Sequence, residues 1–323
     1  MEYKCNSYYC LDTNDKGGGT PQGMKADIIS GRIVKVANNL VDITILTIIV
    51  LLVLFAGYAL WDSNQINQAA DKANYEVYKP TVENEGKSFK ELQALNSEVL
   101  AWLTVYGTSI DYPVTQGRDN MKYVNTSAEG KYSLSGAIFL DFENDGFHDF
   151  NSVLYGHHMA KRAMFGEIDE FSEKGKFDSY RYGNLYYEGQ DYGIEFFCFL
   201  HADAYDESVF NAKLKNSERQ KYLNNLYDKA LQWRDIGVDI DERIILLSTC
   251  SSDSTNGRDI LVGRITNEVY EDMTNNADDK KQVTAGPHET VEETPKLLLL
   301  LIIILAMLSI IKTVSVFYER RKY

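Results

Sequence analysis

A cysteine at the end of an apolar stretch is the first group in this sequence that could do covalent chemistry. Cys250 closes Ile244-Ile245-Leu246-Leu247-Ser248-Thr249-Cys250, and four consecutive apolar residues are typical of a strand buried on both faces. Ser248 and Thr249 bring that strand to a polar edge, where a thiol can meet a substrate. The alternative is that Cys250 is a small hydrophobic residue of the core, which is the more common state of a single cysteine.

A thiol becomes a nucleophile only beside a base or a cation, so partner groups must come from elsewhere in the chain. His157 follows a predicted strand that ends in a glycine turn, and by position alone the adjacent His158 is an equal candidate. Arg258 follows a polar loop and opens the next apolar run, so thiol and guanidinium would face one cleft. Each of these side chains can also be a surface group without chemistry.

Composition excludes several classes of function. The formal net charge of −14 argues against a nucleic-acid partner, because phosphate binding requires a basic surface. Four cysteines are too few for a disulfide scaffold. Cys5 and Cys10 have no second ligand pair at zinc spacing, so we expect neither a metal nor a cofactor. Cys198 lies within an apolar run and is expected to be buried.

Two apolar stretches are long enough to cross a membrane. Residues 43–61 are apolar apart from two threonines and a tyrosine, and they lie too far from the N-terminus for a usual cleaved signal peptide. Arg32 and Lys35 precede this stretch, which predicts a cytoplasmic N-terminus and an extracellular domain. Residues 297–318 reach a similar length if Lys312 extends its ammonium group to the membrane surface, and a basic tail follows.

These stretches divide the chain into six segments, with both termini in the cytoplasm and the large middle part outside. The predicted segments are a cytoplasmic leader (1–42), a transmembrane helix (43–61), an extracellular domain (62–277), an acidic linker (278–296), a second transmembrane helix (297–318) and a cytoplasmic tail (319–323).

The extracellular segment begins with helical spacing and then changes to short strands. Residues 64–78 and 89–102 show the helical period, with Phe89, Val99 and Trp102 on one stripe. The strands that follow are separated by turn residues, which predicts an antiparallel barrel or sandwich with helices packed outside it. The predicted strands are residues 110–114, 136–140, 152–155, 185–187 and 194–200.

One further helix is predicted directly before the cysteine strand. Ser217-x-x-Gln220 is similar to a capping box, and apolar residues then repeat at the helical step as far as Trp233. We expect this helix, residues 217–233, to lie across the sheet.

Four motifs occur in an order that resembles the sortase family, most closely its class B members, over roughly residues 92–270. Any one of them is weak, but four in order are specific. The motifs are Asp111-Tyr112-Pro113-Val114 with Asp119-Asn120, Gly136-Ala137-Ile138-Phe139-Leu140-Asp141, Tyr155-Gly156-His157-His158-Met159, and Leu247-Ser248-Thr249-Cys250 followed by Arg258.

The resemblance implies a fold and a set of roles. Sortases have a closed β-barrel, and class B members add N-terminal helices and a helix before the catalytic strand, which the predicted helices match. In that family the histidine directly after the glycine is catalytic, which selects His157. The arginine that opens the strand after the cysteine matches Arg258, whereas Arg264 lies deeper in its strand. Ser248 and Thr249 are expected to contact substrate.

The implied activity is that of a cysteine transpeptidase at the surface of a Gram-positive bacterium. Cys250 would cleave a C-terminal sorting signal after a threonine through a thioacyl intermediate, and an amine on peptidoglycan or on a pilin lysine would accept the protein. One alternative is a cysteine protease that passes the acyl group to water. Another is a surface scaffold without catalysis, against which the joint presence of Cys250, His157 and Arg258 argues.

Overall fold

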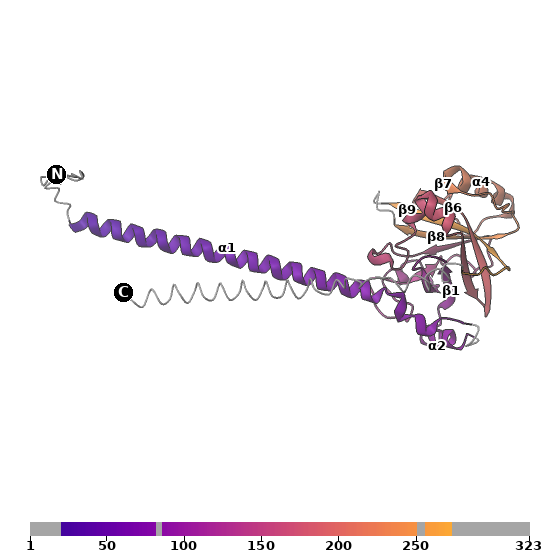
Figure 1. Ribbon diagram of the computed structural model, residues 1–323, viewed down its shortest axis with the longest axis horizontal. Coiled ribbons are helices and arrows are strands. Elements are labelled where there is room, and N and C mark those ends of the chain that lie inside the picture. The colour runs from indigo at the N-terminus through magenta and orange to yellow at the C-terminus, as the bar shows by residue number, and fades with distance from the viewer. Residues whose placement is uncertain (1–20, 82–85, 251–255, 273–323) are drawn as a thin grey trace, which may run out of the picture. The chain divides into compact units, whose positions relative to one another are not determined.

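The computed structural model describes residues 21–81, 86–250 and 256–272 (Figure 1). Much of the predicted leader, the acidic linker at 278–296, the second predicted transmembrane helix at 297–318 and the tail at 319–323 lie outside the described residues. One of the two compact units of the chain, Leu60–Glu289, contains the β domain and all the residues considered below for a site.

The chain begins with one continuous helix, α1 (Pro21–Ala69). Among the described residues it is the one helix long and apolar enough to cross a membrane, over Gly31–Ala69. The predicted stretch 43–61 lies within it. The prediction of a separate helix at residues 64–78 was wrong. α1 continues to Ala69, because no glycine or proline interrupts residues 61–69, and two short 3-10 turns follow.

The second expected helix is also shorter than predicted. α2 (Lys87–Leu95) ends where Asn96 adopts an extended conformation, and Val99 and Trp102 belong to strand β1 (Val99–Val105). Trp102 is buried there, and its indole N–H donates a 2.7 Å hydrogen bond to Asp111 of the adjacent strand. The predicted helix at 89–102 therefore combined the apolar residues of α2 with the buried residues of β1, which happen to continue the same spacing.

Nine strands form one mixed sheet in the described part of the chain. Their order is β5-β1-β2-β3-β4-β8-β9-β6-β7, and an additional β5–β6 pairing closes eight of them into a barrel, with β7 outside the ring. The predicted closed β-barrel with peripheral helices is thus confirmed, although β2–β3 and β4–β8 are parallel pairs. The remaining strands are β2 (Asp111–Thr115), β3 (Ile138–Leu140), β4 (Asn151–Tyr155), β5 (Tyr182–Tyr187), β6 (Gln190–Asp203), β7 (Ala230–Trp233), β8 (Arg243–Cys250) and β9 (Gly257–Thr266).

Short helices fill the connections between these elements. α3 (Lys174–Ser179) precedes β5, and α4 (Arg219–Lys229) precedes β7 and β8. The helix predicted at 217–233 therefore ends earlier, and residues 230–233 pair with β6 as β7. The 3-10 turns are Lys72–Asn74, Glu76–Tyr78, Lys122–Val124, Ala160–Arg162, Asp169–Ser172 and Asn216–Glu218.

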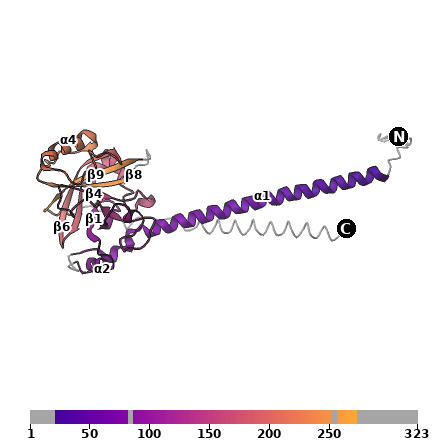
Figure 2. The ribbon, with the colours of Figure 1, turned by 180° about the vertical axis from the view of Figure 1, so that it is seen from behind.

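Two hydrophobic clusters lie on the two faces of the strands. The larger cluster includes Leu247, Leu261 and Phe199, and the smaller includes Leu246 and Ile260 together with apolar residues of α4. Alternation along β8 and β9 therefore buries both faces, as the run of apolar residues before Ser248 predicted. Figures 1 and 2 show α4 beside β6, β8 and β9, with α2 on the other side of the barrel.

Candidate active site

The ends of three neighbouring strands bring the predicted site residues to one edge of the sheet. Tyr155 at the end of β4 is in parallel register with Ser248 of β8, and Gly156 N–H donates to the Ser248 carbonyl at 3.1 Å. Two residues beyond this pair, His157 follows the end of β4 and Cys250 is the last residue of β8. On the opposite side of β8, Cys250 is directly across from Arg258 of β9.

His157 is held by the backbone of a loop from another part of the chain. Its Nε2 lies 2.7 Å from the Val124 carbonyl oxygen. Because a carbonyl can only accept, Nε2 carries the proton, and in the neutral ring Nδ1 is then the basic nitrogen. The half-buried ring is thus oriented with one nitrogen ready to accept a proton.

A glycine of the second motif shapes the loop that carries this carbonyl. Gly136 has a φ of +61°, and a Cβ at this position would lie 2.7 Å from the Val124 oxygen and 2.4 Å from the Tyr123 oxygen. No side chain fits there without displacing the carbonyl that orients His157. The glycine that begins this motif is therefore the sequence signal for the close approach between Gly136 and the Val124 carbonyl.

The two arginines of β9 occupy different environments. Arg258 is half-buried, its Nη1 donates to the adjacent Gly257 carbonyl at 3.1 Å, and it has no carboxylate partner within ion-pair distance among the described residues. Arg264 instead pairs with the buried Glu195 at 2.7 Å and with Glu242 at 3.2 Å. Arg258 therefore has the freer guanidinium, whereas that of Arg264 is occupied by structural ion pairs.

The two predicted substrate-binding residues lie on opposite faces of β8. Both are 1% exposed, and neither hydroxyl has a hydrogen-bond partner within the part of the chain that the structure describes. Ser248 follows the alternation of Leu246 on the α4 face, and Thr249 follows Leu247 on the barrel-interior face. Ser248 is therefore positioned beside Tyr155, and Thr249 lies on the face of β8 that points into the barrel.

A half-buried tyrosine that the sequence analysis did not select as a site residue supports this edge. The Tyr155 hydroxyl donates to the Asp141 carboxylate at 3.0 Å, and Asn120 donates to the same oxygen at 2.8 Å. Burial, and then the charge of Asp141, raise the pKa of Tyr155 far above its ordinary value, while Arg258 opposes the shift. The phenol therefore stays protonated and neutral, and it lies close enough to Arg258 for the guanidinium charge to influence its pKa.

The sequence contained a partial signal for this group. Tyr155 is two residues before His157, so the two lie on the same side of the chain as β4 ends. Asn120 and Asp141 each stand in one of the four motifs, but only the folded structure shows that Asn120 and Tyr155 donate to the same oxygen of Asp141. Phe210, from the segment between β6 and α4, stacks on Tyr155 with ring centroids 6.2 Å apart.

Two histidine–carboxylate pairs lie near the same edge and do not include any of the predicted catalytic residues. His201 contacts the buried Asp259, which is directly across from Thr249, and His158 lies 3.3 Å from Asp169. Burial raises the pKa of the Asp259 carboxyl, and the charge of His201 opposes this effect. The contact with Asp169 gives His158 a different environment from His157.

The other described cysteine has no access to substrate. Cys198 is fully buried, as expected, and burial raises the pKa of its thiol to about 12. Within the described ranges, no group of three or more His, Cys, Asp or Glu residues is arranged to hold a metal ion, and Cys5 and Cys10 lie outside these ranges.

Comparisons with known proteins identify the family to which the barrel and these strand ends belong. No protein-family model matches the chain. Sortase B of Staphylococcus aureus is 26% identical over 229 residues, which cover 68% of this chain and 93% of that protein. Among solved structures, a class B sortase of Streptococcus pyogenes involved in pilus biogenesis is 41% identical, with a TM-score of 0.52 over 56% of this chain and 99% of that one.

Sortase B of Clostridium perfringens is 36% identical, with a TM-score of 0.53 over 55% of this chain and 98% of that one. The closed barrel with its peripheral helices is the fold of the transpeptidases called sortases. The chain belongs to the sortase family and is most similar to its class B members.

Proposed function

We propose that this protein is a membrane-anchored cysteine transpeptidase that cleaves a C-terminal sorting signal after threonine and transfers the protein to an amine. The single observation that carries the proposal is the register of β4, β8 and β9. It brings His157, Cys250 and Arg258, which are far apart in sequence, to the ends of three adjacent strands. The sortase relatives support the same reaction class.

The proposed reaction begins with transfer of the Cys250 proton to Nδ1 of His157. The thiolate attacks the threonine carbonyl carbon, and Arg258 stabilises the negative oxygen that develops there. The imidazolium then protonates the leaving amine as the peptide bond breaks, which leaves a thioester. An incoming amine loses its proton to His157 and attacks the thioester, so that a new amide forms and the thiol is regenerated.

Helix α1 supports anchoring in a membrane. Its large apolar side chains are exposed between Ile43 and Trp61, including Phe55 at 71%. Thr44 and Thr47, two of the few polar residues between Ile43 and Trp61, donate their hydroxyls to carbonyls four residues earlier at 2.8 Å. Such internal bonds satisfy polar groups that hydrocarbon cannot. We infer that α1 anchors an extracellular catalytic domain on a Gram-positive cell.

The decisive experiment uses the full chain and a fluorogenic peptide that contains a sorting signal. The Cys250→Ala variant is expected to lose all measurable turnover, because the proposed nucleophile is removed and Cys198, the other cysteine in the described ranges, is buried. Its thermal unfolding midpoint is expected to stay within a few degrees of the native value, since the change removes only one sulfur atom. Unchanged turnover in this variant would refute the proposal.

The nature of the acyl acceptor separates a transpeptidase from the alternative, a cysteine protease. Products are analysed by mass spectrometry with triglycine or with a lysine-containing pilin peptide present. A new amide is expected with at least one amine. Hydrolysis products alone would support the protease instead. The higher identity to the Streptococcus pyogenes relative favours the pilin lysine as the better acceptor.

A further inference from the structure

The chain that follows β4 forms a closed loop, residues 157–166, which begins at the proposed catalytic histidine. The His157 carbonyl accepts from Phe165 N–H at 3.1 Å, so the two ends of the loop are bonded to each other. His158 also pairs with Met164 as an antiparallel bridge. Contacts that hold Met164 and Phe165 therefore also hold the backbone from which the imidazole of His157 extends.

The backbone of this loop adopts conformations that side chains disfavour. Lys161, Arg162 and Met164 have φ values of 58°, 60° and 51°, and they are three of the four non-glycine residues with positive φ in the described ranges. Such conformations persist only where surrounding contacts enforce them, and they tend to occur at functional sites. Met164 is 1% exposed, so contacts inside the domain must enforce its conformation.

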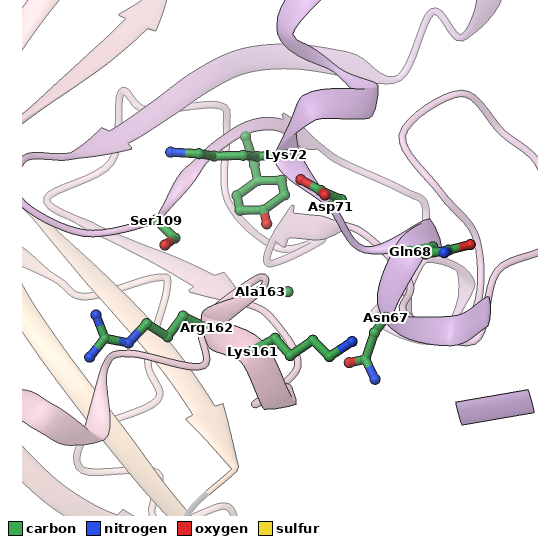
Figure 3. A pocket seen from close by; sticks show the side chains of 9 residues that line it. Asn67, Gln68, Asp71, Lys72, Ser109, Lys161, Arg162 and Ala163 are labelled. Carbon is green, nitrogen blue, oxygen red and sulfur yellow. The ribbon is translucent and has the colours of Figure 1, made fainter. Parts of the chain in front are cut away.

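Close packing does not surround the whole loop, because a cavity of about 180 Å³ lies against it. Lys161, Arg162 and Ala163 line this cavity, together with Ser109 of the β1–β2 turn and Tyr112 of β2. Figure 3 shows the side chains of Lys161 and Arg162 extending in opposite directions along the cavity. Empty space cannot hold a strained backbone, so directional contacts must fix the loop on this side.

Tyr112, from the first of the four motifs, makes such a contact with Met164. Its hydroxyl accepts from Met164 N–H at 3.2 Å and donates to the Ala70 carbonyl at 3.0 Å. The phenol is 2% exposed, and burial raises the pKa of Tyr112 to about 12, so the hydroxyl keeps its proton at neutral pH. One oxygen atom therefore joins the loop to β2 and to the chain directly after α1.

A buried carboxylate ties the chain just after the loop to the same part of the domain. Glu167 is 1% exposed and accepts from Ser109 N–H. Its other oxygen lies 3.4 Å from Nη1 of Arg162, within the strained part of the loop. Residues 109–112 therefore fix this region at two points, Met164 and Glu167.

We propose that Tyr112 is a positioning residue for the transpeptidation, which holds the loop so that the imidazole of His157 stays against the Val124 carbonyl. The inference rests on the proposed function, in which His157 is the base. Without the Tyr112 hydroxyl, Met164 N–H would be buried without a partner, and the loop would open towards the cavity to reach water. His157 would move with the loop, and its 2.7 Å contact with Val124 would be lost.

Kinetics of Tyr112→Phe in the full chain test the proposal, because this change removes one oxygen atom. With the fluorogenic sorting-signal peptide, kcat is expected to fall roughly ten- to a hundredfold, as for a misplaced catalytic group. KM should stay within about twofold, since the buried Tyr112 cannot touch substrate.

Tyr106→Phe is the matched control. The Tyr106 hydroxyl belongs to the same β1–β2 turn but donates to the Tyr270 carbonyl at 3.0 Å, so its loss should leave kcat at the native value. Thermal unfolding midpoints of both variants are expected to fall, because each loses a hydrogen bond. Native kcat in Tyr112→Phe, or an equal loss of kcat in Tyr106→Phe, would overturn the proposal.

A spectroscopic measurement separates positioning from a general loss of stability. Nitrogen NMR spectra of the chain with isotope-labelled histidine are recorded at about pH 8.5, where imidazoles are neutral. The native His157 signal, assigned with His157→Gln, should show the tautomer that carries its proton on Nε2. Tyr112→Phe is expected to give a mixture of tautomers, and Tyr106→Phe the native signal. An unchanged His157 signal in Tyr112→Phe would overturn the proposal.

Amide hydrogen exchange in the native chain keeps the proposal testable if Tyr112→Phe does not fold. Met164 N–H is expected to exchange as slowly as Phe165 N–H, because the buried hydroxyl of Tyr112 accepts from it. Exchange at Met164 as fast as in an exposed turn would overturn the proposal.

Turnover by the native chain separates this inference from the proposed function. If the native chain turns the peptide over and Tyr112→Phe has the same kcat, the positioning role alone is refuted. If the native chain shows no turnover, the transpeptidase is refuted, and the tautomer of His157 in the two variants still decides whether Tyr112 positions the ring.

Discussion

The orientation of His157 follows from a single backbone contact. The Val124 carbonyl accepts from Nε2, so Nδ1 is the nitrogen that can take a proton from a thiol. We expect His157→Ala to lower kcat/KM for the sorting-signal peptide roughly 10²–10⁴-fold, the usual range for loss of a general acid–base group. Steady-state kinetics with the fluorogenic peptide measure this loss.

The neighbouring histidine provides a matched control. His158 lies 3.3 Å from Asp169 and is exposed, so His158→Ala should leave kcat/KM within a fewfold of the native value. If His158→Ala caused the larger loss, the assignment of the base to His157 would be wrong. Position in the sequence cannot separate these residues, whereas their contacts can: His157 bonds to a backbone carbonyl and His158 faces a carboxylate.

Replacing the two arginines of β9 is expected to have different effects, on catalysis for Arg258 and on stability for Arg264. Arg258→Ala should lower kcat about a hundredfold or more, because a donor to the developing oxyanion is lost. Its unfolding free energy should change by less than about 1 kcal/mol, since Arg258 makes no ion pair within the described residues. Peptide kinetics together with urea denaturation distinguish these effects.

The corresponding change at Arg264 should act on stability instead. Arg264→Ala leaves the buried Glu195 with Arg181 as its remaining partner, so we expect a loss of about 1.5–3 kcal/mol in unfolding free energy, as for a hydrogen bond to a charged group. The folded fraction should retain native kcat. A large loss of kcat in folded Arg264→Ala would mean that the oxyanion role belongs to Arg264.

The candidate site was largely predictable because strand ends are visible in sequence. Cys250 follows an apolar run and His157 follows a strand that stops at a glycine, so both were expected at a sheet edge. The bond between Tyr155 and Asp141 was not predictable, because Asp141 follows β3 and Tyr155 ends β4, and the register of these two strands cannot be read from the sequence. The contact between His157 and Val124 is a long-range contact of the same kind.

At the scale of elements, a carboxylate before β4 ties the segment between β6 and α4 to the sheet. Burial alone would raise the pKa of Asp149, but hydrogen bonds from Asp145 N–H, the Asn144 amide and Lys213 together hold it below its ordinary 3.8. Lys213 belongs to the same connecting segment as Phe210, which stacks on Tyr155. Asp149 therefore supports one wall of the site.

The lowered pKa makes this tie sensitive to acid. A carboxyl whose folded pKa lies below its unfolded value stabilises the fold fully above the unfolded pKa, and this contribution is lost as pH falls. We expect Asp149→Asn to lower the unfolding free energy by about 1–2 kcal/mol at pH 7. The difference from native protein should shrink below about pH 4. Urea denaturation across this range measures it, and a difference independent of pH would contradict the ionic explanation.

The errors in element boundaries arose where tertiary contacts outweigh local periodicity. Val99 and Trp102 match the helical stripe of Phe89, but Trp102 gains a hydrogen bond to Asp111 and pairs with two neighbouring strands. Residues 230–233 continue the spacing of α4, yet they pair with β6. The barrel order could not be predicted, because closure depends on β5 pairing with β6.

At the scale of the whole molecule, the topology determines whether the catalytic edge meets surface proteins at all. Helix α1 supports one membrane crossing, and the stretch at 297–318 remains a prediction outside the described residues. If both stretches cross, the leader and the tail are in the cytoplasm while Cys250 is outside. Cys198 is fully buried. The predicted topology then puts the remaining native cysteines, Cys5 and Cys10, on one side of the membrane and Cys250 on the other.

Cysteine labelling in intact cells therefore tests this topology. In a Cys250→Ala background, a membrane-impermeant maleimide should label neither the leader cysteines nor an introduced Tyr323→Cys until the cells are permeabilised. The native chain should be labelled at Cys250 in intact cells, because the positive-inside rule places that edge outside. Labelling of Tyr323→Cys in intact cells would show that residues 297–318 do not cross the membrane. Labelling of Cys5 or Cys10 would show that the N-terminus is outside, so that α1 has the opposite orientation.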